Sequence, residues 1–316
     1  MNQGNESKAK LLDGAPLAAD IKREVAREID QFRRKYGTAP SLAAVQVGND
    51  PASAVYVKNK IRACEEVGIR SEHLALPAET TQADLLALID SLNTRSDIDG
   101  ILVQLPLPSQ IKEAAIIEAV DPNKDVDGFH PVNVGRLAMG QPRFVPCTPA
   151  GIIELLDRNE IQITGANACV IGRSQIVGRP VAQLLLQRDA TVTICHSKTR
   201  DLPAVTREAD ILIVAIGRAG FVGREHIKRG ANVIDVGMNK VTDEAAVRSL
   251  FGNESEQRLQ VLAKRGYTLV GDVNSAEVAE IAGGLTPVPG GVGLLTVAML
   301  MRNTLRAARL RRAFDG

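Results

Sequence analysis

The sequence predicts an α/β protein in which parallel sheets are wound with helices on both faces and shared between two domains. Short apolar runs alternate with amphipathic stretches along the chain, which is the pattern of such sheets. The length of 316 residues exceeds what a single core usually encloses, so two domains are expected. A passage dense in Pro, Gly and Asn, residues 121–148, is the expected hinge.

Apolar spacing places the elements of the N-terminal half. Leu17, Ile21, Val25 and Ile29 recur at near-helical intervals, which predicts a helix over residues 17–35. The elements expected after it are a strand at 42–47, a helix at 51–66, a strand at 70–76, a helix at 81–93 and a strand at 100–104.

The alternation resumes in the C-terminal half and predicts a second parallel sheet. The elements expected there are a helix at 148–159 and strands at 168–171, 191–195, 210–216 and 232–236. A final apolar helix is expected from Leu294 to about Arg309, and its arginine-rich end suits the negative pole of the helix dipole.

Composition excludes several classes of function. The 38 basic and 37 acidic residues balance, and aromatic residues make up only 3%, so no nucleic-acid partner is expected. The polar start of the chain and the lack of a long apolar run predict no signal peptide and no membrane association. The four cysteines form no CxxC pair, which favours reduced thiols in a cytoplasmic protein, and no residue spacing predicts a metal site.

A glycine turn at residues 172–178 follows one predicted strand and precedes a helix. Its backbone N–H groups and the helix dipole suit a pyrophosphate. Gly172 and Gly178 lie six residues apart, whereas the standard dinucleotide fingerprint has five, so an ordinary β–α turn remains the alternative. The candidate cofactor-binding residues are Gly172, Arg173, Ser174, Ile176, Val177, Gly178, His196 and Ser197.

The end of the next strand indicates which dinucleotide is bound. An NAD enzyme usually has an acidic residue there for the ribose hydroxyls, whereas this strand ends in His196, Ser197 and Lys198. With Arg173 nearby, these residues suit a 2′-phosphate, which predicts NADP. The alternative is that Arg173 and Lys198 are ordinary surface charges.

Tyr56 and Lys60 lie four residues apart on a predicted helix and therefore share one face. A Tyr-x-x-x-Lys pair also occurs in short-chain dehydrogenases, but there it follows the glycine turn, whereas here it precedes it. An amphipathic helix with a solvated lysine is the alternative. Gln104 ends an apolar strand, where open α/β sheets bind ligands, and Asp125 and Asp127 follow in a loop.

Taken together in their order, these motifs resemble the bifunctional 5,10-methylenetetrahydrofolate dehydrogenase/cyclohydrolase family, from about Leu12 to Arg302. The motifs that carry the resemblance are Tyr56 with Lys60, Val-Gln-Leu-Pro-Leu-Pro at 103–108, Asp-Val-Asp-Gly at 125–128, Pro-Cys-Thr-Pro at 146–149, the turn at 172–178 and Pro-Val-Pro-Gly-Gly-Val-Gly at 287–293.

The resemblance implies an N-terminal α/β/α catalytic domain, residues 1–148, completed by the C-terminal helix 294–316. It implies a Rossmann-like NADP-binding domain over 149–293, a cleft between the domains, and a homodimer. Its members oxidise 5,10-methylenetetrahydrofolate with NADP and hydrolyse the methenyl product to 10-formyltetrahydrofolate, so tetrahydrofolate one-carbon derivatives are the expected partners.

The resemblance also assigns roles to individual residues. Lys60 matches the catalytic lysine, Tyr56 its companion against the folate, Gln104 the glutamine that bonds the lysine, and Asp127 the pterin-binding aspartate. The residues that match the folate loop are Pro287, Gly290, Gly291 and Val292.

The chain departs from the family pattern in two places. Leu294-Leu295 replaces a proline-containing pair, which could loosen the start of the last helix. Residues 241–268 form a longer excursion than most members have, with helical stretches at 244–250 and 256–265. A superficial insertion is the favoured interpretation, and a dimer or regulatory contact is the alternative.

Two rival classes stay open on the sequence. An amino- or hydroxy-acid dehydrogenase with the same two-domain plan would oxidise such an acid and ignore folates. A non-catalytic folate- or nucleotide-binding protein would bind without turnover. The joint presence of Tyr56, Lys60, Gln104 and Asp127 argues against both.

Overall fold

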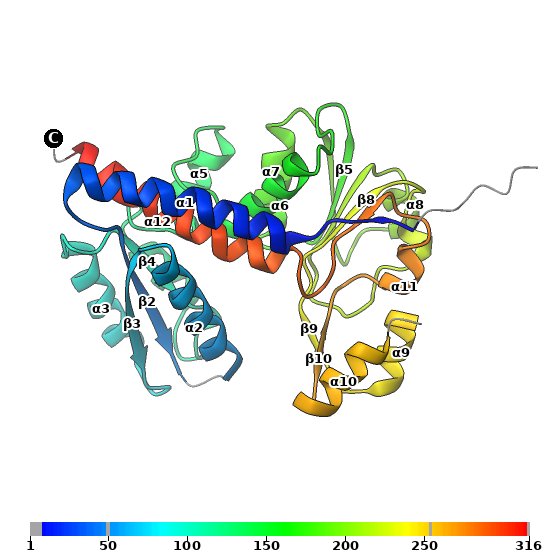
Figure 1. Cartoon of the computed structure of the whole chain (residues 1–316), viewed down its shortest axis with the longest axis horizontal. Coiled ribbons are helices and arrows are strands. Elements are labelled where there is room, and N and C mark those ends of the chain that lie inside the picture. The colour runs from blue at the N-terminus through cyan, green and yellow to red at the C-terminus, as the bar shows by residue number, and fades with distance from the viewer. Residues whose placement is uncertain (1–7, 49–50, 253–254, 315–316) are drawn as a thin grey trace, which may run out of the picture. The chain divides into compact units, whose positions relative to one another are not determined.

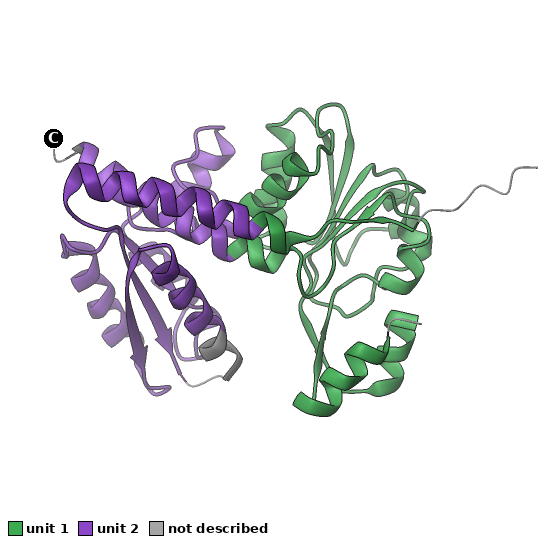
Figure 2. Cartoon of the chain, viewed as in Figure 1, with its two compact units in different colours: residues 1–17, 148–296 green, residues 18–147, 297–316 purple. Residues whose placement is uncertain are grey.

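The computed structural model describes residues 8–48, 51–252 and 255–314. The chain divides into two compact units, coloured separately in Figure 2. Unit 1 comprises residues 1–17 and 148–296, and unit 2 comprises residues 18–147 and 297–316. Each unit is built on its own parallel sheet, as the alternation of apolar runs predicts.

Unit 2 contains a three-stranded parallel sheet in the order β3-β2-β4. The central strand is buried along its whole length because it pairs on both edges and is covered on its faces, which explains its continuous apolar character. The expected elements of this half are confirmed as β2 (Ser41–Val47), α2 (Pro51–Glu66), β3 (Arg70–Leu76), α3 (Gln82–Thr94) and β4 (Gly100–Val103).

Two long helices, α1 (Gly14–Tyr36) and α12 (Val292–Phe314), lie together over most of their length in unit 2 (Figure 1). Arg302 pairs with Glu24 at 3.4 Å and Arg309 with Glu28 at 2.6 Å between them. Helix α12 begins at Val292, two residues before the Leu294-Leu295 pair that replaces the family's proline-containing pair.

The passage expected as a hinge is partly helical. It contains α5 (Pro131–Ala138), and it follows α4 (Glu113–Ala119), which was also unforeseen. His130 caps α5 by accepting a hydrogen bond from the Val132 N–H through Nδ1 at 3.1 Å. A short helix with Pro at its first position and little apolar periodicity gives a weak sequence signal.

Unit 1 contains a six-stranded parallel sheet in the order β1-β11-β8-β7-β5-β6. The predicted strands are confirmed, and so is the predicted helix at 148–159, which the structure gives as α6 (Cys147–Arg158). The elements of this sheet and its cover are β1 (Lys10–Leu11), β5 (Asn167–Ile171), α7 (Gly178–Leu186), β6 (Thr191–Cys195), α8 (Leu202–Thr206), β7 (Ile211–Val214), a 3₁₀ turn at Arg224–His226, β8 (Asn232–Asp235), α11 (Ser275–Val278) and β11 (Gly284–Leu285).

Strand β1 places Lys10 and Leu11 in the sheet of unit 1, whereas the sequence analysis assigned residues 1–148 to one domain. The Lys10 N–H donates to the Gly283 carbonyl and the Leu12 N–H to the Leu285 carbonyl, both at 2.9 Å. Two residues of edge pairing have no periodicity that could reveal them. The boundary therefore differs from the expected one at this end.

The described residues of the excursion at 241–268 form a hairpin and two helices in unit 1. The excursion starts and ends in an antiparallel hairpin of β9 (Asn239–Val241) and β10 (Thr268–Val270), which carries α9 (Glu244–Phe251) and α10 (Ser255–Arg265) (Figure 1). The two helices lie within a residue or so of the predicted stretches.

Candidate active site

A pocket of about 320 Å³ lies at the carboxyl ends of three neighbouring strands, β7, β5 and β6. The chain leaves β5 for β6 on one side and later adds β7 on the other. Such a switch point is where open α/β sheets bind ligands. The lining residues are Ile171, Gly172, Arg173, His196, Ser197, Leu202, Ala215, Ile216, Arg218 and Phe221.

The glycine turn is tight at both glycines. At Gly172, where φ is +119°, an added Cβ would lie 2.2 Å from the Ala215 carbonyl oxygen. At Gly178 an added Cβ would lie 2.2 Å from the Gly172 carbonyl oxygen. Both positions therefore require glycine, and the spacing of six preserves the close approach of helix to strand that the standard fingerprint provides.

The turn also suits an anion. The Ser174 hydroxyl accepts hydrogen bonds from the N–H groups of Val177 and Gly178 at 3.2 and 3.3 Å, which fixes the start of α7. Within the described chain, the N–H groups of Arg173 and Gln175 have no hydrogen-bond acceptor. Exposed backbone donors at a helix N-terminus are the usual cradle for a pyrophosphate.

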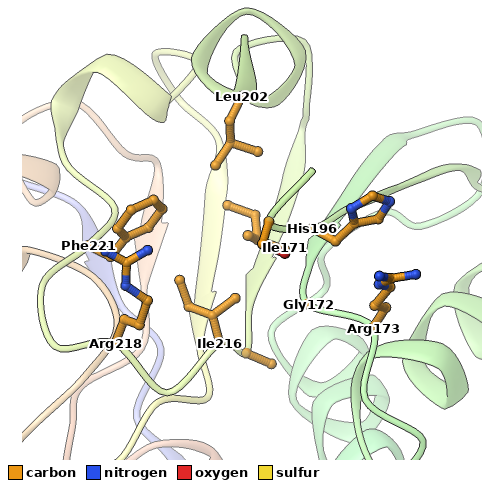
Figure 3. Close-up of a pocket in the computed structure, with 10 residues that line it drawn as sticks. Ile171, Gly172, Arg173, His196, Leu202, Ile216, Arg218 and Phe221 are labelled. Atoms are coloured by element: carbon orange, nitrogen blue, oxygen red, sulfur yellow. The ribbon is translucent and has the colours of Figure 1, made fainter. Parts of the chain in front are cut away.

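Cationic side chains line two walls of the pocket. Figure 3 shows Arg173 and His196 on one side and Arg218 with Phe221 on the other. The Arg218 guanidinium lies 4.2 Å from the centre of the Phe221 ring, and no lining residue is acidic. This charge pattern suits a phosphorylated ribose, because the arginines can bond the phosphate. An acidic side chain in the lining would repel the phosphate.

The loop that carries Arg218 is held by a buried carboxylate. Asp272 is fully buried and accepts the N–H groups of Ile216, Gly217 and Arg218 at 2.7 to 2.9 Å. A carboxylate that accepts three backbone donors fixes the loop's path. Burial raises the pKa of the neighbouring Asp235, which accepts the Asp272 N–H, to about 7.

A second cluster lies in unit 2, around Lys60. The Lys60 side chain is buried at 7% exposure, its ammonium donates to Gln104 Oε1 at 3.2 Å, and it lies 4.9 Å from the centre of the Tyr56 ring. Gln104 Nε2 donates in turn to the Leu105 carbonyl at 2.6 Å. The glutamine orientation is thereby fixed with its oxygen toward the amine, and three of the predicted catalytic residues meet.

Asp127, the fourth, belongs to the same electrostatic cluster. Burial raises the pKa of its carboxyl to about 7, Lys60 opposes that rise, and Asp125 adds to it. Asp125 has a structural environment, because it accepts the N–H groups of Phe129 and His130 at 3.2 and 2.8 Å and the Asn133 amide at 2.8 Å.

Cys147 borders the cluster as a buried thiol. Burial raises the pKa of Cys147 well above its ordinary value, with Asp127 adding to the rise, so the thiol stays protonated. Burial also raises the pKa of Tyr56, with Cys147 and Asp127 as further causes. A protonated, buried thiol is a poor nucleophile, so Cys147 packs in this cluster rather than reacting.

The loop at 286–292 lies in unit 1. Thr286 is buried and its hydroxyl accepts the Asp235 N–H at 2.7 Å, while the Gly290 carbonyl accepts the Gly14 N–H at 3.0 Å. Gly290 has φ of +117°, and Val292, the first residue of α12, is 3% exposed. Pro287 and Gly291 lie between these anchors. The loop is therefore fixed at both ends.

The described residues offer neither a metal cluster nor a membrane span. No group of three or more His, Cys, Asp and Glu side chains in residues 8–48, 51–252 and 255–314 could hold a metal ion. No helix in that part of the chain is long and apolar enough to cross a membrane.

Comparison with known proteins assigns both units to one family. Residues 12–127 match the catalytic domain, and residues 146–312 the NAD(P)-binding domain, of tetrahydrofolate dehydrogenase/cyclohydrolase. The chain belongs to this family. The sequence-based resemblance is confirmed, and so is its two-domain α/β fold.

Full-length members of the family are close relatives. The bifunctional protein FolD of Koribacter versatilis is 56% identical over 304 residues, which is 96% of this chain and 98% of that protein. The crystal structure of FolD from Campylobacter jejuni has a TM-score of 0.85 at 44% identity and covers 96% and 99% of the two chains. FolD of Trypanosoma brucei, solved with NADP and an inhibitor, has a TM-score of 0.87 at 38% identity, with 98% and 99% covered.

Some residues of these sites were missed from the sequence. Arg218 and Phe221 follow β7, and the rule that ligands bind at the carboxyl ends of parallel strands could have found them. Asn303 of α12 donates to the Val126 and Val145 carbonyls at 2.8 and 2.9 Å, on either side of the Asp127 loop. No local signal marks Asn303, because its partners lie more than 150 residues away.

Proposed function

We propose that this protein oxidises 5,10-methylenetetrahydrofolate to 5,10-methenyltetrahydrofolate with NADP and hydrolyses the product to 10-formyltetrahydrofolate. The observation that carries the proposal is the buried Lys60 ammonium, bonded to Gln104 and set against Tyr56, within the stretch that matches the family's catalytic domain. Membership of the family and the nucleotide pocket of unit 1 support it further.

The oxidation needs positioning more than proton transfer. A nitrogen lone pair drives hydride from the N–CH₂–N bridge and leaves a resonance-stabilised cation, so no general base is required. NADP supplies the acceptor for this hydride when bound. The turn at Gly172 and Gly178 would hold its pyrophosphate, and Arg173, His196 and Ser197 its 2′-phosphate.

The hydrolysis does require proton transfers. Water attacks the methenyl carbon and loses one proton. When the C–N bond to the departing ring nitrogen breaks, the new hydroxyl loses its proton to become the formyl oxygen and the nitrogen gains one, so one proton is released overall. We propose Lys60 for these transfers, with Gln104 orienting the amine and Tyr56 placing the folate. Asp127, when ionised, can accept two donors from the amino-pyrimidinone edge of the pterin, a geometry that fixes the ring.

NADP preference can be tested at Arg173. Changing Arg173 to Glu should raise the KM for NADP at least about tenfold, because a charge-assisted hydrogen bond to the phosphate is replaced by repulsion. The KM for NAD should change much less. Arg265, exposed on α10 and not part of the pocket lining, is the matched control as Arg265→Glu. Equal or better use of NAD by the unaltered protein would contradict the assignment.

The raised pKa of Asp127 predicts a pH-dependent cost in stability. The folded carboxyl holds its proton up to about pH 7, whereas the ordinary value is 3.8, so folding binds a proton between these limits and stability falls as pH rises through them. Asp127→Asn removes this loss. Its melting temperature should exceed that of the unaltered protein by more at pH 8 than at pH 5, and folate turnover should fall. A difference that is constant across pH would rule out titration of Asp127 as the cause.

The domain roles and the assembly are also proposals. Unit 2 would carry the proton chemistry and unit 1 would bind NADP, in accord with the two family matches. We propose that the protein is cytoplasmic, because its four free, buried cysteines suit a reducing compartment.

We also propose that the protein is a homodimer. Light scattering on the purified protein tests the dimer, since a monomer mass would reject it.

One assay tests the function as a whole. Purified protein is given 5,10-methylenetetrahydrofolate and NADP, and NADPH and the 10-formyl product are followed together, with NAD in a parallel run. Both products should appear with NADP. NADPH without formyl product above the spontaneous rate would reject the hydrolytic half, and no NADPH would favour an acid dehydrogenase or a non-catalytic binding protein.

A further inference from the structure

We propose that Arg258, on the inserted helix α10, is a positioning residue for the folate loop at 286–291. The inference rests on the proposed function, because that function gives the loop its role. It assigns a purpose to an excursion for which a superficial insertion was the favoured interpretation.

The contact joins the insertion directly to the loop. Arg258 Nη2 donates to the Val288 carbonyl at 2.7 Å, across 30 residues of sequence. Val288 lies in the middle of the loop, and both side chains are half-buried. A hydrogen bond from a charged donor is stronger than a neutral one, so this carbonyl is held more firmly than an ordinary loop carbonyl.

The arginine is itself held in place. Its guanidinium lies 4.8 Å from the centre of the Phe251 ring, at the end of α9. A ring beneath the planar group limits its rotamers and adds a cation–π attraction. The contact with Phe251 therefore holds the Arg258 guanidinium in a conformation from which it can donate to the Val288 carbonyl.

Backbone pairing and side-chain contacts anchor the insertion to the rest of unit 1. The β9–β10 hairpin pairs Val241 with Thr268 where the excursion begins and ends. The carbonyl of Leu250, on α9, accepts a hydrogen bond from the hydroxyl of Ser275, on α11, at 3.2 Å. The Leu250 side chain lies so close to Gly220 that an added Cβ would clash with it. An anchored helix can fix a loop, whereas a loosely attached one could not.

Arg258 holds the middle of the loop, whereas other hydrogen bonds hold its two ends. Thr286 is bonded to Asp235 at the strand, and Gly290 to Gly14 near the start of α12. Between them the loop contains two prolines, which have no N–H to donate. The bond from Arg258 to the Val288 carbonyl therefore fixes the middle of the loop.

The test compares Arg258→Ala with Arg265→Ala. Arg265 is an exposed arginine on the same helix, so the control removes the same charge and the same side chain. Arg258→Ala should raise the KM for 5,10-methylenetetrahydrofolate about tenfold, the size expected for loss of one charged hydrogen bond. The KM for NADP should stay within about twofold, and Arg265→Ala should match the unaltered protein in both.

A second pair of variants separates positioning from general loosening. Arg258→Lys keeps the charge and can still donate to the carbonyl, so it should restore part of the folate KM. Phe251→Leu removes the ring behind the guanidinium and should give a smaller rise than Arg258→Ala. These graded effects on one substrate are not expected from a change that merely destabilises unit 1.

Three results would overturn the inference. They are an unchanged folate KM in Arg258→Ala, an equal rise in Arg265→Ala, and a parallel rise in the KM for NADP, which would mean that the whole unit has loosened. Failure of the proposed function is distinguishable, because the unaltered protein would then not turn over the folate at all.

Discussion

Replacing Lys60 by Met should abolish hydrolysis of 5,10-methenyltetrahydrofolate while NADP binding persists. Methionine has similar length and apolar bulk but carries no transferable proton, so the buried site at Gln104 and Tyr56 keeps its packing and loses its acid–base group. General acid–base catalysis contributes on the order of 10² to 10⁴ in rate. The cyclohydrolase rate, followed from the methenyl compound directly, should therefore fall at least about 100-fold.

Lys58→Met is the matched control, because Lys58 lies on the same helix and is exposed, whereas Lys60 is buried. It should keep near-normal rates. NADP affinity, measured by titration of protein fluorescence or calorimetry, should be the same in both variants. Near-normal hydrolysis by Lys60→Met would remove this lysine from its proposed role.

Gly178→Ala should have the opposite effect: NADP affinity should fall while hydrolysis of 5,10-methenyltetrahydrofolate persists. The added methyl would lie 2.2 Å from the Gly172 carbonyl oxygen, 2.6 Å from its carbon and 2.9 Å from the Arg173 nitrogen, all of them backbone atoms that cannot turn aside. The strand and helix must separate, which opens the turn. We expect NADP affinity to fall at least about tenfold, since backbone contacts to pyrophosphate depend on this close approach.

Gly135→Ala is the control for this change. It is the same substitution at a helical glycine, and an added Cβ there meets nothing within 4 Å, so no loss of NADP affinity or of stability is expected. Hydrolysis of methenyltetrahydrofolate, which needs no hydride acceptor, should survive in Gly178→Ala. Unaltered NADP affinity would show that the turn does not hold the dinucleotide.

Together the two variants separate the half-reactions. Lys60 belongs to the cluster of unit 2 and Gly178 to the glycine turn of unit 1, so each substitution alters one set of contacts directly. Complementary losses would support one chain with two chemically distinct steps. A common loss in both variants would indicate unfolding, which melting curves would reveal.

Much of the fold could be predicted because its signals are local. The apolar stretch of β2 and the start of α2 at Pro51 were placed within a residue. The glycine turn at 172–178 was predicted between a strand and a helix, and the structure adds that neither Gly172 nor Gly178 has room for a Cβ. The short elements β1, α5 and β11 could not be predicted, because two to eight residues carry too little periodicity to stand out.

The candidate site divides in the same way. Tyr56 and Lys60 share a helical face by spacing alone, and family resemblance brings Gln104 and Asp127 to them. The sequence could not predict that burial raises the pKa of Asp127 to about 7, since that depends on which groups surround the carboxyl after folding.

The sequence by itself determined the family, the alternation of elements and the residue types at the two sites. Only the tertiary structure decided that Arg218 and Phe221 line the pocket of unit 1, that Asp272 holds the loop that carries Arg218, and that Arg258 reaches Val288. The physical reason is range. Periodicity and turn chemistry act over a few residues. The hydrogen bonds of Asp272 and Arg258 join atoms 30 to 56 residues apart, which only the order of strands in the sheet and the path of the insertion bring together.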